Sequence, residues 1–174
     1  HGVAAISADL RPTRDPGGLH YQGDARSLLH LRRWRYVIGF PPCDHTAYSG
    51  SQHFPPKVAD GRQWDGLQFI LQILCADTDH ALVEQPRSFF QIWRQPDGRV
   101  QPYHFGDGEQ KETWLWTTPG TPMIRHTQVV PGRERRSASV READPAERKR
   151  RRSEIPAGFA EAIAAQVAEL LTQP

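Results

Sequence analysis

The stretch from Tyr36 to Cys43 constrains the fold more than any other part of the sequence. Residues 36–38 form a short apolar run, which is typical of a strand buried in a parallel sheet. Pro41 and Pro42 follow, and they end the strand because proline has no backbone N–H to donate to the ladder. Cys43 then stands at the carboxyl end of the strand, where open α/β sheets place their ligands.

Carboxylates follow other apolar runs in the same way. Asp9 follows the run that begins at residue 3, Asp24 follows Gln22-Gly23, and Glu84 follows residues 81–83. Because the carboxyl ends of parallel strands share one edge of a sheet, we expect these side chains near the thiol.

The remaining pattern alternates strands with helices, which predicts a mostly parallel sheet covered by helices on both faces. The 174 residues suffice for one α/β domain with a core. We expect strands at residues 3–8, 36–40, 81–83, 100–103 and 113–116. We expect helices at 25–34, 60–74, 87–93 and 155–171, with Asp60 capping the second and Trp64 on its apolar face. Residues 43–57 read as a long mobile loop.

The net charge of +2 is unevenly distributed, because residues 117–153 form a basic, loop-rich segment. Such a segment either contacts phosphates or is a solvated surface. No apolar run approaches the ~20 residues of a membrane span, and no secretory signal is evident. We therefore expect a cytoplasmic protein that does not bind membranes and whose two cysteines are free thiols.

The thiol of Cys43 can be a nucleophile if a neighbour takes its proton, or it can simply be a small buried group. Zinc is an alternative, with Cys43, His45 and His53 as ligands, but no fourth ligand occurs at useful spacing. We therefore expect no metal. Ser49 with His53 suggests a hydrolase, but the Gly-x-Ser-x-Gly elbow is missing.

Several stretches occur in the order found in DNA cytosine-5 methyltransferases: Pro41-Pro42-Cys43, residues 83–86, residues 106–111 and residues 155–164. The chain most closely resembles short, phage-type members of that superfamily, which implies the cytoplasm of a bacterium or of a phage-infected host. This likeness also takes in residues 7–10, 22–24, 49–50, 105–116 and 145–153, so it covers nearly the whole chain.

The resemblance implies a Rossmann-like fold and a set of catalytic roles. Cys43 would add to C6 of a cytosine flipped out of double-stranded DNA, which turns C5 into a nucleophile. Glu84 would hold the N3 and amino edge of the ring. Lys111, together with Gln110, would take the place of the family's Gln-x-Arg-x-Arg element.

The resemblance also implies a cofactor and a partner. S-adenosylmethionine would bind through its ribose to Asp9 and through its adenine to Asp24, with Leu10 and Pro41 beside it. DNA would be contacted by a set of polar and basic side chains: Ser49, Gln110, Arg148, Arg150, Arg151 and Arg152.

The chain departs from the family pattern in several places. The first strand and its glycine-rich loop, which would hold the methionine part of the cofactor, are expected upstream of residue 1 or from a second chain. Gln85-Pro86 replaces Asn-Val, and residues 44–46 replace a glutamine-containing turn. Residues 117–153 are too few for a ~100-residue recognition domain. The alternatives are therefore an inactive nucleic-acid-binding remnant, or C5 modification of a free nucleotide or with a non-methyl group.

Overall fold

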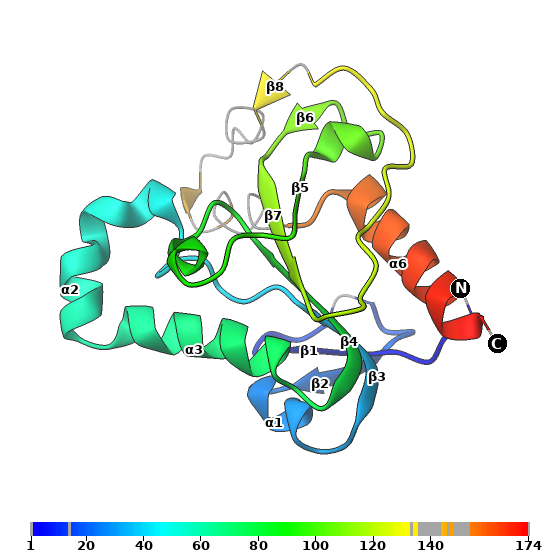
Figure 1. Ribbon diagram of the computed structural model, residues 1–174, viewed down its shortest axis with the longest axis horizontal. Coiled ribbons are helices and arrows are strands. Elements are labelled where there is room, and N and C mark those ends of the chain that lie inside the picture. The colour runs from blue at the N-terminus through cyan, green and yellow to red at the C-terminus, as the bar shows by residue number, and fades with distance from the viewer. Residues whose placement is uncertain are drawn as a thin grey trace.

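The computed structural model describes residues 2–13, 15–132, 134–135, 144–145, 147 and 154–173, and its fold is mixed α/β (Figure 1). The strands are β1 (Ile6–Asp9), β2 (Leu19–Gln22), β3 (Trp34–Gly39), β4 (Thr78–Gln85), β5 (Gly98–Val100), β6 (Glu109–Gln110), β7 (Thr113–Thr117) and β8 (Glu134–Arg135). The α-helices are α1 (Arg26–Leu29), α2 (Phe54–Ala59), α3 (Arg62–Leu74) and α6 (Ala157–Thr172), and the 3₁₀ helices are η1 (Tyr48–His53), η2 (Phe89–Ile92) and η3 (Pro102–His104). Within these ranges no helix has the length and apolarity needed to cross a membrane.

The main sheet is four-stranded, in the order β3-β4-β7-β5. β3 and β4 are parallel, whereas β7 runs antiparallel to both β4 and β5. The α/β class is therefore as expected, but the sheet is more mixed than the sequence suggested. β1 pairs with β2, and β6 with β8, in separate two-stranded parallel sheets.

Helices cover both faces of the main sheet, as expected. On one face Val83 of β4 belongs to a core cluster with Leu29 of α1 and with Leu67 and Ile70 of α3. On the other face Leu82 packs with α6. Neighbouring residues of β4 serve opposite faces because strand side chains alternate.

The contact between α3 and β3 is unusually close. A Cβ added at Gly39 would lie 2.5 Å from Cδ1 of Ile73, so a larger residue there would force the Ile73 side chain to move. The close approach fixes the end of β3, from which the chain enters the turn that carries Cys43.

The pair of strands β1 and β2 lies outside the main sheet and is poorly buried. Ile6 is 40% exposed and Leu19 is 69% exposed, although parallel strands are normally covered on both faces. The short helix α1 joins this pair to the rest: Arg26 bonds Asp65 of α3 at 3.0 Å and stacks over Phe69.

Some expected elements differ in extent. The expected helix 25–34 shrinks to α1, because β3 already begins at Trp34. β2 was not expected, and the expected helix 87–93 is the 3₁₀ helix η2. Residues 48–59 are not a loop, since they form η1 and α2. Their rings Tyr48 and Phe54 pack on each other and on Phe89 of η2.

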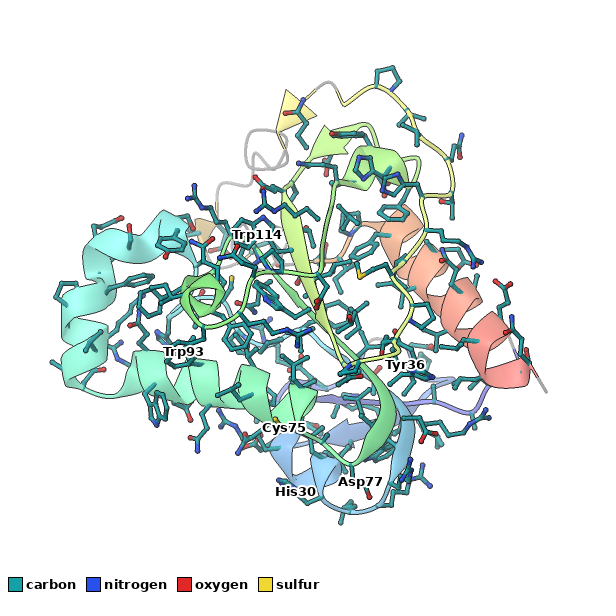
Figure 2. All side chains as sticks on the ribbon, in the orientation of Figure 1. His30, Tyr36, Cys75, Asp77, Trp93 and Trp114 are labelled. Atoms are coloured by element: carbon teal, nitrogen blue, oxygen red, sulfur yellow. The ribbon has the colours of Figure 1, made fainter. Side chains whose placement is uncertain are left out.

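Helix α3 is rotated relative to the expected apolar face. Its buried side is centred on Leu67, Ile70 and Ile73, whereas Trp64 is 56% exposed. Trp64 packs edge-on against Trp93, which Figure 2 shows next to α3. The cap is also different from the expectation: Gly61 is the N-cap, and Asp60 bonds Arg62.

Candidate functional site

The turn after β3 places Cys43 over the carboxyl end of the parallel strands. Its carbonyl oxygen accepts hydrogen bonds from the backbone N–H groups of Thr46 (3.1 Å) and Ala47 (2.9 Å), so the chain closes a full turn at the cysteine. Cys43 is half-buried in this turn. Cys75 ends α3 just before β4 begins, so the two thiols lie at opposite ends of the parallel strands, and both are free.

The structure brings Glu84 and Lys111 to the same place from different segments. Glu84 lies near the end of β4 and is only 8% exposed. Lys111, just after β6, places its Nζ 4.0 Å from Oε1 of Glu84. The hydroxyl of Thr113, at the start of β7, donates to the carbonyl oxygen of Lys111 at 3.1 Å, and the Thr113 side chain also lowers the pKa of Glu84.

These groups alter one another's proton affinity. Burial raises the pKa of Glu84 above its ordinary 4.5, opposed by the charge of Lys111 and the bond from Thr113. Burial also raises the pKa of the Cys43 thiol, and the carboxylates of Asp44 and Glu84 raise it further, while Lys111 lowers it. Burial therefore shifts each of the two groups toward its neutral form, and the positive charge of Lys111 shifts each toward its ionised form.

An open pocket of about 390 Å³ lies beside the cysteine. It is lined by Cys43, Asp44, Ala47, Ser49, Gly50, Gln52, His53 and Lys57. Ser49, expected to contact DNA, is exposed and lines the same pocket as Cys43. A smaller cavity of about 110 Å³ lies against α6, away from the cysteine.

The expected cofactor residues fall into two groups. Asp9 and Asp24 lie together at the carboxyl ends of β1 and β2, where the N–H of Gly23 bonds the carbonyl of Asp9 at 2.9 Å. Both carboxylates are exposed, and Leu10 beside them is 74% exposed. Pro41, in contrast, is buried in the cysteine turn and its carbonyl accepts a bond from Gln85.

The expected nucleic-acid residues are only partly described. Gln110 lies exposed on β6, where its amide donates to the carbonyl of Gly132 at 2.8 Å. Arg148, Arg150, Arg151 and Arg152 lie outside the described residues. The part of the chain that the structure describes contains no group of three or more His, Cys, Asp or Glu side chains that would hold a metal ion.

Sequence reasoning missed two residues at this site, Thr46 and Gln85. Both are fully buried, and their side chains bond each other at 2.9 Å. A buried amide directly after Glu84 on a central strand was the only signal for Gln85, because amides are seldom buried without a hydrogen-bonding role.

No protein-family profile, curated protein or solved structure matches the chain. The chemical interpretation of the site therefore depends on its own geometry: a half-buried thiol, a buried carboxyl and a cation at one edge of the sheet.

Proposed function

We propose that this protein modifies C5 of cytosine in DNA through a covalent adduct on Cys43, as a methyltransferase. The observation that carries the proposal is the convergence of Cys43, Glu84 and Lys111, which come from three separate segments of the chain. Each can assist the addition of a thiol to a pyrimidine, and Cys43 also lines an open pocket.

The addition balances as follows. The Sγ–C6 bond forms as the thiol proton leaves to solvent, the C5=C6 π bond breaks, and its electron pair moves to C5. C5 would then form a bond to the methyl group of a methylsulfonium donor, whose S–CH₃ bond would break and leave a neutral thioether, and the C5 proton would leave to solvent. The C6–Sγ bond then breaks, and the electron pair left at C5 by its proton restores the double bond as the sulfur departs as thiolate.

Glu84 assists because it is buried. Burial raises the pKa of Glu84, so its carboxyl takes up a proton more readily than an exposed one, and the protonated carboxyl can donate a hydrogen bond to N3 as negative charge develops on the ring. Lys111 adds a positive charge 4.0 Å away, which stabilises both the thiolate and the developing charge.

The residues of β1 and β2 fit one half of the expected cofactor. Asp9 and Asp24 present adjacent exposed carboxylates, which suit the hydroxyl and amino groups of an adenosyl moiety. S-adenosylmethionine bound there would supply an electrophilic methyl group.

The split sheet is consistent with a further strand. Within the described residues β3 pairs only with β4, and β1 pairs only with β2. A strand between β1 and β3, from upstream sequence or a second chain, would join the two sheets and cover the exposed Ile6.

A second candidate is a nucleic-acid-binding protein of the same fold that transfers no group. It is favoured by the raised pKa of Cys43, since a nucleophilic cysteine normally has a lowered one. In that case the cysteine turn would be a structural remnant.

The test separates addition from transfer. Duplex DNA containing 2-pyrimidinone in place of cytosine accepts a thiol at C6 and needs no cofactor, whereas 5-fluorocytosine gives a stable adduct only after the methyl group has been transferred. Each duplex is incubated with the protein, with Cys43→Ser and with Cys75→Ser, and denaturant-stable adducts are weighed by intact mass spectrometry.

We expect the 2-pyrimidinone adduct with the parent protein and Cys75→Ser, and none with Cys43→Ser. A 5-fluorocytosine adduct that needs S-adenosylmethionine would establish methyl transfer. Duplex binding without any adduct would instead support the non-catalytic candidate.

A further inference from the structure

The side-chain amide of Gln85 ties together the two ends of the cysteine turn. Its Nε2 donates to the carbonyl oxygen of Pro41 at 2.5 Å, before Cys43, and its Oε1 accepts from the hydroxyl of Thr46 at 2.9 Å, after Cys43. One amide on β4 thus holds the chain on both sides of the thiol.

The tie before Cys43 has a particular importance. Neither Pro41 nor Pro42 has a backbone N–H, so this part of the chain cannot be held by donating to a neighbouring strand. The part after Cys43 has other anchors, because Phe89 donates to the carbonyl of Thr46 at 2.7 Å and Tyr48 donates to Arg87 at 3.0 Å.

Both partners are buried where their bonds cannot be replaced by water. Gln85 is 1% exposed and Thr46 is 0% exposed. A buried polar group without its partner bears the full desolvation penalty, so the amide strongly favours the one turn geometry that satisfies it. Gln85 also adjoins Glu84 on β4, so the backbone of this strand links the position of the cysteine turn to that of the carboxyl.

We infer that Gln85 and Thr46 are positioning residues, which fix the Cys43 turn relative to Glu84 so that the thiol meets C6 while the carboxyl meets N3. This inference rests on the proposed function for its substrate. Its physical content, a thiol held in one place by a buried amide, is testable without that substrate.

The experiment uses Thr46→Val, which keeps the shape of the side chain and removes the hydroxyl, and Thr46→Ser, which restores a hydroxyl. The matched control is Thr121→Val, because Thr121 is also buried and its hydroxyl pairs with Thr118 at 2.8 Å and His80 at 3.3 Å, beyond the end of β7. All variants carry Cys75→Ser, so that Cys43 is the only thiol.

Two rates are measured on each protein. The first is alkylation of Cys43 by iodoacetamide across a pH series, and the second is adduct formation with the 2-pyrimidinone duplex. In Thr46→Val the turn can open, so alkylation should speed up by about threefold or more and its pH profile should move to lower pH, because a solvated thiol ionises more readily.

Adduct formation should slow by roughly tenfold or more in Thr46→Val, because misplacing a reacting group by about 1 Å can slow a reaction a hundredfold. Thr46→Ser should return both rates toward the parent values, and Thr121→Val should leave both unchanged although it also loses a buried hydrogen bond. General destabilisation does not produce opposite changes in the two rates together with rescue by serine.

The inference is overturned if Thr46→Val matches Thr121→Val in both rates. Should Thr46→Val not fold, Gln85→Glu carries the same test, since its second oxygen would face the Pro41 carbonyl and break that tie. If the parent protein forms no adduct, the proposed function fails, and the alkylation rates alone decide whether the amide positions the thiol.

Discussion

Nζ of Lys111 lies 4.0 Å from Oε1 of Glu84, although the two residues belong to different segments of the chain. Burial raises the pKa of Glu84 and of Cys43, and the positive charge of Lys111 lowers both. Removing the charge of Lys111 should therefore raise the pKa of the Cys43 thiol.

Lys111→Met should slow the alkylation of Cys43 at neutral pH by at least about twofold, because the thiolate is the reactive form and its stabilising charge is gone. The measurement is the rate of iodoacetamide labelling of the peptide that contains Cys43, with the exposed Cys75 as an internal reference. Lys111→Arg, which keeps the charge, is the control and should stay close to the parent rate. Equal rates in the methionine and arginine variants would show that the lysine charge does not reach the thiol.

Glu84 should make the protein less stable as pH rises. Its folded pKa is raised by burial, so the folded state holds the proton more tightly than the unfolded state does. Below its ordinary value of 4.5 both states are protonated and the stabilising effect is fully present; it is lost as pH rises through the folded pKa. The side chain of Glu84→Gln does not titrate, so the free energy of unfolding of this variant, relative to that of the parent, should increase with pH by about 1–3 kcal/mol.

Urea unfolding of both proteins across a pH series from about 4 upward, which covers the usual carboxyl titration, measures this difference. A constant difference between them at all pH values would mean that Glu84 titrates normally in the folded protein.

Gly158 in the first turn of α6 should not tolerate a side chain. A Cβ there would overlap the carbonyl oxygen of Phe105, which is backbone and cannot rotate away. Gly158→Ala should therefore destabilise the protein by about 3 kcal/mol, the upper end of overpacking, despite the helix propensity of alanine. Gly50→Ala, with no atom within 4 Å of its added Cβ, should change the unfolding free energy by less than about 0.5 kcal/mol. Urea unfolding of the two variants measures both effects, and equal stabilities would show that α6 shifts freely.

Asp24 should contribute to the binding of S-adenosylmethionine. In a form of the protein extended upstream of residue 1, Asp24→Ala should weaken binding by about 1–3 kcal/mol, the usual effect of leaving a polar group unpaired. Because Asp24 also accepts a bond from the N–H of Arg26 at 2.9 Å, Asp24→Asn is the control that keeps this local contact. Calorimetry measures the affinity of each variant for S-adenosylmethionine. If Asp24→Ala binds as tightly as the parent, Asp24 is not part of the cofactor site.

The basic segment should make DNA binding dependent on salt. Replacing Arg148, Arg150, Arg151 and Arg152 by glutamine should lower the slope of log affinity against log salt by up to roughly 0.9 for each phosphate that is no longer neutralised. Base preference should change little, because phosphate contacts position a protein and do not specify sequence. Filter binding across a salt series measures the slope, and identical slopes would identify these arginines as solvated surface.

Strong local signals made much of the fold predictable. The signal for each of three elements lies in residues that are close together in the sequence. These signals are the two prolines after the apolar run of β3, the apolar stripe of α6, and the run Thr113–Thr117 of β7. The short strand β2 was missed, because its exposed Leu19 and Tyr21 do not form the apolar run of a buried strand.

The site was less predictable than the fold. Cys43 and Glu84 follow from strand ends, but Lys111 came only from the family resemblance, since no local pattern brings a residue after β6 to the end of β4. The bonds of Gln85 join it to Pro41 and Thr46, which are 44 and 39 residues away, and so have no signature in either segment. Trp64 was placed on the wrong face because periodicity alone does not fix how far a helix is rotated.

The separation of β1 and β2 from the main sheet implies that the protein does not open as one unit. Their backbone bonds are exposed, and few buried side chains hold them in place, so their amide hydrogens should exchange with deuterium well before those of β4. A ligand held by Asp9 and Asp24 would bind to a poorly buried part of the described chain. Slower exchange of the amide hydrogens in residues 6–22 would therefore show directly that a ligand is bound at the ends of β1 and β2, whether or not Cys43 reacts.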